Sequence, residues 1–157
     1  MINIRRGTID DLQQVHALIK ELAVYEKAPD EVTNTVQEMH WDGFGENPIF
    51  KFFVAETEEG IVGIALYYIA YSTWKGKMLF LEDLIVTERL RRSGIGKMLF
   101  NAVAREAKEI GAKRMKWQVL DWNEPAIAFY KKIGADISSE WLNCNFDENQ
   151  IKAYSAD

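Results

Sequence analysis

The sequence predicts a single domain of mixed α/β structure covering residues 1–157. Short apolar runs typical of strands alternate along the chain with segments in which apolar residues recur every three or four positions, as in amphipathic helices. A chain of 157 residues is long enough to bury about two thirds of its unfolded surface in one core. Because no repeat, low-complexity tract or linker interrupts the pattern, we expect one mixed sheet with flanking helices.

The N-terminal segment is expected to form a strand and then a helix. Ile2 to Arg6 alternates apolar and polar residues, which favours a strand. Thr8 lies three residues before Asp11, a spacing typical of a helix N-terminus, and apolar residues follow at helical intervals. The sequence Ala-Pro-Asp at residues 28–30 is expected to end this helix.

A second, weaker helix and two strands come next. The helix is expected to begin near Thr33 or Thr35 and to end at the glycine-containing residues 42–45. From Phe50 the pattern changes to that of strands, which we expect over Lys51–Glu56 and Ile61–Tyr71, with a turn between them.

The second half of the chain contains the longest regular segments. Met78–Val86 predicts an apolar central strand, and apolar residues at helical spacing predict a long helix over residues 95–110. Lys113–Leu120 is expected to form another strand and Asn123–Ile133 a short helix. Ile137–Phe146 is expected to close the sheet, with a last helical turn in the tail.

Composition narrows the functional classes. The net charge of −5 argues against nucleic acid as the main partner and suits a small cationic substrate. No apolar run approaches the roughly 18 residues of a membrane span, and no N-terminal signal is present. The single cysteine, Cys144, excludes an intrachain disulfide and fits the cytoplasm. Two histidines without ligand spacing argue against a metal site.

The most specific local pattern is the turn after the central strand. Arg91-Arg92-Ser93-Gly94-Ile95-Gly96 connects that strand to the long helix, an arrangement that directs several backbone N–H groups at a phosphate. The spacing R-x-x-G-x-G is neither the Walker pattern nor the dinucleotide pattern. Glycine beside arginine is also common in surface turns, but the flanking strand and helix favour a ligand that carries a pyrophosphate.

This turn resembles motif A of the GNAT N-acetyltransferases, which bind acetyl-coenzyme A there. Residues 121–135, with the pattern A-x-x-F-Y-x-x-x-G-A, resemble motif B of the same family. Residues 18–26, 71–77 and 81–83 are similar to the diamine acetyltransferases, and Ser-Thr-Trp-Lys-Gly at 72–76 is most like the thialysine-type branch. The resemblance covers roughly residues 2 to 146. It implies a mixed, mostly antiparallel sheet with a splayed central strand pair.

Two residues are candidates for proton transfer. Glu82 lies among apolar neighbours, and a poorly solvated carboxyl has a raised pKa, so Glu82 is a candidate base for the amine. It could instead anchor the ammonium, or simply be a surface carboxylate. The resemblance places Tyr130 beside the thioester sulfur as the acid for the departing thiolate. A core aromatic with a satisfied hydroxyl is the structural alternative for Tyr130.

The resemblance also implies sets of binding residues. For acetyl-coenzyme A these are the backbone of Leu84, Ile85 and Val86, the turn Arg91, Arg92, Ser93, Gly94, Ile95, Gly96 and Lys97, and Asn123, Glu124, Pro125, Ala126 and Tyr130. A backbone N–H near Leu84 is expected to stabilise the oxyanion. For the amine they are Tyr25, Glu26, Trp74, Glu82, Asp83, Lys116, Trp117, Gln118 and Glu140. No metal residue is implied.

Two departures from the family pattern bear on the substrate. Ser72 stands where the polyamine branch has an acidic residue, and the segment around Glu140 looks shortened. Both favour a shorter, lysine-like amine over spermidine. We therefore expect a cytoplasmic N-acetyltransferase that acts on a small primary amine by direct attack in a ternary complex. The resemblance implies a homodimer.

Other functions remain open at this point. A protein or peptide N-acetyltransferase would need an open groove, and a non-catalytic coenzyme A-binding module would not need Glu82 and Tyr130. His16 and His40 are expected to be structural, and Cys144 has no basic neighbour in sequence that would favour an acyl-cysteine route.

Overall fold

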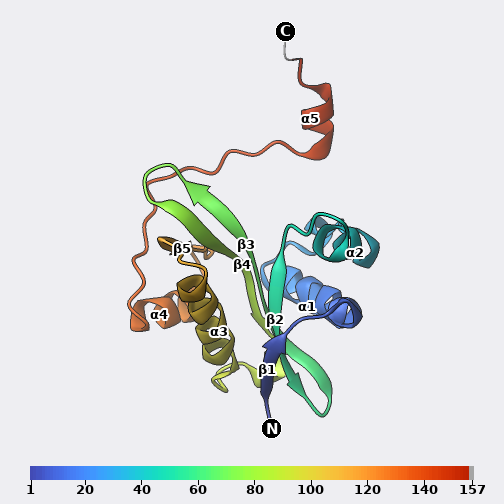
Figure 1. The fold of residues 1–157 in the computed structure, drawn as a ribbon, viewed down its shortest axis with the longest axis vertical. Helices are drawn as coiled ribbons and strands as arrows, with labels where there is room; N and C mark the ends of the chain where they lie inside the picture. Colours follow the sequence, from blue (N-terminus) through green and yellow to red (C-terminus); the bar gives the residue numbers. More distant parts are fainter. Residues whose placement is uncertain (156–157) are drawn as a thin grey trace. The chain divides into compact units, whose positions relative to one another are not determined.

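The computed structural model describes residues 1–155, and a five-stranded sheet in the order β1-β2-β3-β4-β5 lies at its centre (Figure 1). Neighbouring strands are antiparallel, except that β4 and β5 are parallel. The predicted mixed, mostly antiparallel sheet is therefore confirmed. The strands are β1 (Asn3–Arg6), β2 (Lys51–Thr57), β3 (Gly60–Ser72), β4 (Gly76–Val86) and β5 (Arg114–Lys116).

Five α-helices and three short 3-10 helices accompany the sheet. The α-helices are α1 (Leu12–Tyr25), α2 (Val36–Phe44), α3 (Ile95–Glu109), α4 (Glu124–Lys132) and α5 (Glu148–Ala153). The 3-10 helices are η1 (Ile9–Asp11), η2 (Pro29–Glu31) and η3 (Glu88–Leu90). By contact density the chain forms two compact units, residues 1–118, which contain the sheet and α1 to α3, and residues 119–157, which contain α4 and α5.

Helices cover both faces of the sheet. Helices α1 and α2 pack against one face and α3 against the other (Figure 1). Alternation along β2 explains the division, because Phe52 points to the α1 side and Phe53 to the α3 side. The central strand β3 is buried on both faces between Ile61 and Tyr67, which is why its sequence is continuously apolar rather than alternating.

The first two helices begin at the residues that local sequence signals indicate. Thr8 and Asp11 form a reciprocal capping box, so the predicted N-terminus is confirmed, although its first turn is the 3-10 helix η1. At α2 the Thr35 hydroxyl accepts a hydrogen bond from the Glu38 backbone N–H at 3.1 Å. The sequence left Thr33 and Thr35 as alternatives for this start, and the structure selects Thr35.

Within the second unit, α4 has well-defined ends. Asn123 caps its N-terminus by accepting a hydrogen bond from the Ala126 backbone N–H. At the C-terminus Gly134 has φ of 90°, and the Ala135 N–H reaches the Tyr130 carbonyl at 3.0 Å. This is the Schellman arrangement, for which glycine is preferred because it adopts positive φ without steric cost. The predicted short helix is confirmed.

Two predicted strands differ from the structure. The strand expected over Lys113–Leu120 contains only the three residues of β5. The strand expected over Ile137–Phe146 is wrong, because that segment has no ladder and exposes large apolar residues such as Trp141 and Leu142. Alternating apolar and polar residues indicate an extended chain with two different sides, but a strand also needs a neighbouring backbone for its hydrogen bonds.

Candidate active site

The turn between η3 and α3 has the backbone geometry of an anion-binding loop. Arg92 and Gly94 both lie in the left-handed region, with φ of 65° and 90°. Gly94 is the N-cap of α3, and no side chain caps this helix. The first backbone N–H groups of α3 therefore point out of a glycine-lined turn, which is how helix N-termini and backbone nests bind phosphate.

Glycine is suited to residues 94 and 96 of this loop for two different physical reasons. Gly94 needs positive φ, a conformation that L side chains rarely adopt. Gly96 lies inside α3, and a Cβ there would only touch Val86 Cγ2 at 3.8 Å, an ordinary contact. The packing of the protein does not require a glycine at residue 96, whereas close approach of a ligand to its backbone would.

The Arg91 side chain points to the protein, unlike the exposed Arg92. Its Nε donates to the Val86 carbonyl at 3.1 Å, and its guanidinium carbon lies 4.4 Å from the centre of the Tyr25 ring. Its Nη2 also lies 4.0 Å from Glu21 Oε1. The Val86 carbonyl, expected to pair with the pantetheine arm, thus already accepts one hydrogen bond from Arg91, and its second lone pair remains for a ligand.

Strand β4 has an open edge beside this loop. Its ladder with β5 comprises only Met78 to Phe80, whereas its ladder with β3 continues to Val86. Leu84, Ile85 and Val86 thus have a strand partner on one side only. The predicted splay of the central strands is present, and it leaves backbone groups of β4 without a ladder partner on the β5 side.

A β-bulge lies at Glu82. Leu66 pairs with Asp83 and Tyr67 with Leu81, so Glu82 is the extra residue of β4. Side chains of consecutive residues in a regular strand point to opposite faces, and a bulge breaks that rule and re-aims a side chain. The sequence predicts the strand but gives no sign of this bulge.

Three carboxylates, Glu26, Glu82 and Asp83, form what we call the carboxylate cluster. Burial, and then the negative charges of Glu82 and Glu26, raise the pKa of Asp83 to about 6. Burial also raises the pKa of Glu26. Glu82 itself is exposed, so the predicted poorly solvated environment is wrong for Glu82 and is instead that of Asp83. The bulge explains why Asp83 rather than Glu82 is poorly solvated, because it interrupts the alternation of side chains from which burial is inferred.

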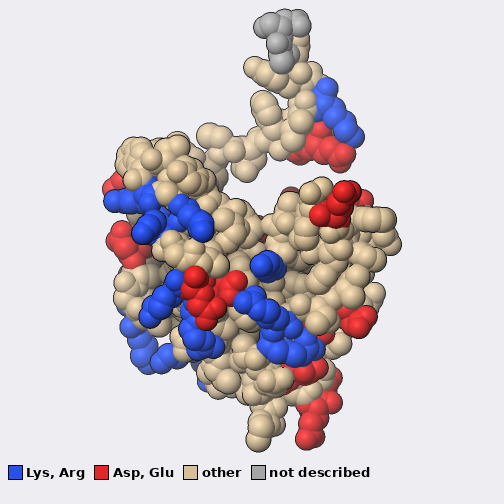
Figure 2. Space-filling model, viewed as in Figure 1, with Lys and Arg blue, Asp and Glu red and all other residues tan. Residues whose placement is uncertain are grey.

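No lysine or arginine pairs with the carboxylate cluster anywhere in residues 1–155. Elsewhere opposite charges meet. Over α3 and the neighbouring edge of the sheet, basic and acidic side chains lie next to one another (Figure 2), and Arg6 Nη2 pairs with Glu106 Oε2 at 2.5 Å. Unpaired, partly buried carboxylates of like charge favour a cationic ligand.

The second unit holds the other predicted site residues. Glu124, Pro125 and Ala126 form the first turn of α4, directly after the capping Asn123. Tyr130 is buried, and its ring centre lies 5.4 Å from that of Phe129. These residues have the local structure that the sequence predicts.

The predicted amine contacts outside the carboxylate cluster lie on several elements. Trp74 is 83% exposed at the turn between β3 and β4, eight residues before Glu82 and therefore about 20 Å or more away along an extended strand. The Trp117 ring instead packs edge-on against Phe100 of α3, with centres 5.2 Å apart. Lys116 is exposed at the end of β5, Gln118 follows that strand, and Glu140 is exposed after α4.

Sequence reasoning missed two residues near the site. Glu21 accepts hydrogen bonds from the Thr87 hydroxyl at 3.2 Å and the Glu88 backbone N–H at 2.8 Å. Tyr68 has a pKa raised by burial and by the charge of Glu82. Helical spacing could have identified Glu21, since it lies one turn before Tyr25 on the same face of α1. Tyr68 carries no local signal.

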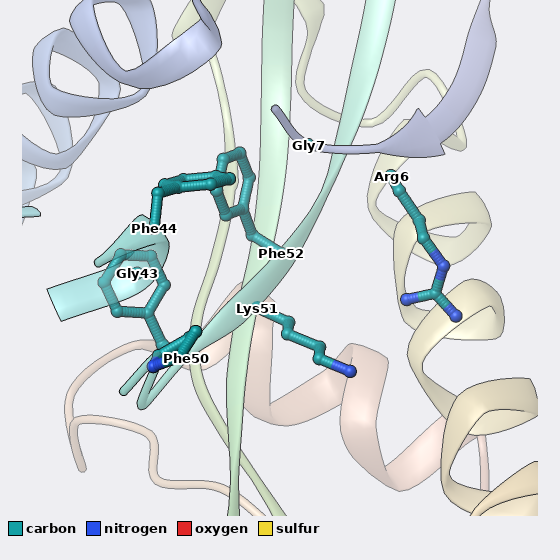
Figure 3. A pocket seen from close by; sticks show the side chains of 8 residues that line it. Arg6, Gly7, Gly43, Phe44, Phe50, Lys51 and Phe52 are labelled. Carbon is teal, nitrogen blue, oxygen red and sulfur yellow. The ribbon is translucent and has the colours of Figure 1, made fainter. Parts of the chain in front are cut away.

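Two cavities in the first unit lie away from the predicted site. One of about 300 Å³ opens between α2 and the β1–β2 edge, where Phe44, Phe50 and Phe52 lie on one side of β2 and Lys51 on the other (Figure 3). The second, of about 480 Å³, is lined by Tyr67, Tyr68 and Glu106, among others. Neither cavity is lined by a residue of the carboxylate cluster or of residues 91–97, the turn into α3 that we call the phosphate turn.

Within residues 1–155, no group of three or more His, Cys, Asp or Glu side chains is placed to hold a metal ion. In the same range no helix has both the length and the apolar character needed to cross a membrane. His16 is buried and its Nε2 lies 2.8 Å from the Asn34 carbonyl oxygen, which supports the structural role predicted for it.

Comparison with known proteins places this geometry in a family. The sequence model of the acetyltransferase (GNAT) family matches residues 12–135 of this chain. The chain belongs to the GNAT acetyltransferase family. GNAT acetyltransferases use acetyl-coenzyme A, and the family together with its named relatives identifies the chain as an N-acetyltransferase.

Two relatives and one solved structure illustrate the similarity. Thialysine N-epsilon-acetyltransferase from Sus scrofa is 40% identical over 160 residues, which cover 95% of this chain and 94% of the relative. The spermidine/spermine N(1)-acetyltransferase-like protein 1 from Homo sapiens is 34% identical over 94% of this chain and 23% of its own length. An integron cassette protein from V. cholerae has 25% identity and a TM-score of 0.78, covering 96% of this chain and 95% of its own.

Proposed function

We propose that this N-acetyltransferase transfers an acetyl group from acetyl-coenzyme A to a primary amine of a small, lysine-like cation such as thialysine. The carboxylate cluster carries the proposal, since three like charges without a protein cation favour a ligand ammonium. Relatives named for thialysine acetylation support the choice of amine. The serine at residue 72 and the exposed, irregular segment around Glu140 favour a short amine over a polyamine.

The phosphate turn fits a coenzyme A pyrophosphate. The uncapped N-terminus of α3, the left-handed Gly94 with open space beside it, and the absence of a side chain at Gly96 all suit an anion close to the backbone. The pyrophosphate would be held by Arg92, Ser93, Gly94, Ile95, Gly96 and Lys97. The pantetheine arm would pair with the edge of β4 at Leu84 to Val86, which has a strand partner on one side only. Asn123 to Ala126 would contact other parts of the coenzyme. When bound, acetyl-coenzyme A supplies the acetyl thioester.

The chain's own residues handle protons. A lysine-like ammonium has a pKa near 10.4, so its neutral form costs about 4.6 kcal/mol at pH 7. Exposed Glu82 accepts that proton through a water molecule, while Asp83 and Glu26 hold the cation. A β4 backbone N–H near Leu84 stabilises the oxyanion, and the Tyr130 hydroxyl donates a proton to the departing sulfur.

The proposal includes the assembly and compartment. Exposed apolar side chains on the β3–β4 turn, such as Tyr71 and Trp74, support a homodimer. The single exposed Cys144 supports a cytoplasmic location.

The test is release of coenzyme A thiol by the purified protein with thialysine, lysine, putrescine, spermidine and a peptide bearing a free N-terminus. We expect turnover with thialysine or a short diamine, reduced at least about 100-fold in Tyr130→Phe. The matched control is Tyr154→Phe, an exposed tyrosine of the C-terminal segment. Turnover with the peptide alone would replace the small-amine proposal by peptide acetylation, and binding without any turnover would favour a non-catalytic module.

A further inference from the structure

We infer that Arg91 is a positioning residue, whose guanidinium ties the phosphate turn to the C-terminal turn of α1 rather than binding phosphate. The inference rests on the proposed function, since it concerns a turn assigned to coenzyme A. It also links that turn to the helix that carries Tyr25 and Glu26 of the proposed amine site.

The contacts of Arg91 hold its guanidinium group against the protein. Nε donates to the Val86 carbonyl at 3.1 Å, at the end of β4. The planar group lies 4.4 Å from the centre of the Tyr25 ring, within cation–π range, and Nη2 lies 4.0 Å from Glu21 Oε1. To reach a phosphate, Arg91 would have to give up contacts with two parts of the chain, the end of β4 and helix α1.

Glu21 provides a second tie between the same elements. Its carboxylate accepts hydrogen bonds from the Thr87 hydroxyl and from the Glu88 backbone N–H, the latter at 2.8 Å. Glu21 and Tyr25 are four residues apart and therefore share one face of α1. That face thus holds both the start and the end of the segment 87–91, which leads into the phosphate turn.

Arg92 provides the contrast within the same motif. It is exposed, adopts a left-handed backbone conformation, and forms no hydrogen bond or ion pair with the rest of residues 1–155. Two adjacent arginines therefore have separate roles. Arg92 presents its charge to solvent, where an anion can meet it, whereas the charge of Arg91 is used inside the protein.

The same turn of α1 continues into the proposed amine site. Glu26 follows Tyr25 directly, and its negative charge is one cause of the raised pKa of Asp83. Arg91 thus connects the phosphate turn to Tyr25, the residue that precedes Glu26.

The first test measures coenzyme A affinity by isothermal titration calorimetry at low and high salt. Tyr25→Ala should weaken binding about 5-fold, because it removes the aromatic face that holds Arg91, and Tyr25→Phe should retain binding. Arg91→Met and Arg91→Lys should weaken binding alike, since an ammonium cannot form the same planar contacts. The matched control, Arg92→Met, should also flatten the salt dependence of binding, which Arg91→Met should not.

Two outcomes would overturn the inference. One is coenzyme A affinity in Tyr25→Ala equal to that of the unmodified protein. The other is a salt dependence in Arg91→Met as flat as in Arg92→Met, together with retained affinity in Arg91→Lys, which would make Arg91 a direct phosphate ligand.

Amide hydrogen exchange on the protein without ligand separates this inference from the proposed function. Tyr25→Ala and Arg91→Met should each speed exchange of amides 87–93 about 5-fold, and the double variant should add little, because both changes break one contact. Unchanged exchange would overturn the tie even if coenzyme A binds. Accelerated exchange in a protein that binds no coenzyme A would overturn the proposed function and leave the tie established.

Discussion

Two groups of carboxylates in the first unit have opposite electrostatic surroundings. Near the N-terminus, Arg5 contacts both Asp11 and Glu56, at 2.8 and 2.9 Å. We call these three residues the Arg5 network. In the carboxylate cluster of Glu26, Glu82 and Asp83, no such cation is present within residues 1–155.

The pKa values follow this difference. Hydrogen bonds from Arg5 lower the pKa of Asp11, although Asp11 is only 5% exposed. Burial and the like charges of Glu82 and Glu26 raise the pKa of Asp83 to about 6. Burial alone thus does not decide the state of a carboxyl. Asp11 pairs with a cation of the protein, whereas Asp83 has none within residues 1–155, as a site for the proposed ammonium ligand would require.

The largest expected effect is on catalysis by the carboxylate cluster. Glu82→Gln should lower kcat about 100-fold or more, because the amide cannot accept the proton of the ammonium. The matched control is Glu58→Gln, an exposed glutamate in the turn between β2 and β3. Steady-state kinetics with saturating acetyl-coenzyme A measures the effect. A kcat within 3-fold of the unmodified protein would mean that Glu82 only anchors the amine.

The second effect is on stability against pH. The folded state holds the Asp83 proton more tightly than the unfolded chain, so the free energy of unfolding decreases as the pH rises from about 4 to about 6. The loss of stability caused by ionising Asp83 is then complete above pH 6. Asp83→Asn should therefore stabilise the protein at pH 7.5, by at most about 3 kcal/mol, and have little effect at pH 4.

Urea denaturation at both pH values tests this prediction, with exposed Asp136→Asn as the control. Equal stabilisation at pH 4 and pH 7.5 would show that ionisation of Asp83 does not destabilise the folded state. For Asp11 the sign is reversed. Its lowered pKa contributes stability at neutral pH that is lost as the pH falls through the acid range.

The third effect concerns the cation of the Arg5 network. Arg5→Met should destabilise the protein by about 2 kcal/mol at pH 7, because it leaves the buried Asp11 carboxylate without its partner. Partial exposure of Arg5 keeps this below the cost of a fully buried pair. Exposed Arg105→Met is the control for loss of charge, and urea denaturation is the measurement. Equal stability of the two variants would remove the distinction between the two carboxylate groups.

The smallest effect is stabilisation by a ligand cation. A lysine-like amine at ten times its dissociation constant should add about 1.4 kcal/mol of stability, a few degrees in Tm. Asp83→Asn should reduce this gain, and Asp11→Asn should not, although both remove a carboxylate that is at least partly buried. Thermal unfolding with and without the amine provides the readout. An equal gain in both variants would place the amine elsewhere.

Local chemistry predicted most of the fold. Helix starts at Thr8, Thr35 and Asn123 follow from side chains that accept hydrogen bonds from nearby backbone N–H groups. The phosphate turn was equally readable, because the positive φ of Gly94 is a property of one residue in one turn. In each case the determining contact spans only a few residues.

What failed depended on partners far away in sequence. The strand expected over Ile137–Phe146 has no ladder, and β5 stops after three residues where β4 parts from it. Glu82 was expected in a poorly solvated position, but it is exposed and Asp83 is partly buried instead. The cause is a bulge, which is defined only by the pairing of β4 with β3. Tyr68 carried no local signal, and the hydrogen bonds of Glu21 to Thr87 and Glu88 became evident only from the packed elements.

By itself, the sequence determined the order of the elements, the caps and the anion-binding turn, since these depend on contacts between residues close along the chain. Tertiary structure alone decided which carboxylate is buried and where Arg91 directs its charge. Those outcomes depend on strand register and on the packing of α1 beside the turn after β4, and both require contacts between residues that belong to different elements of the fold.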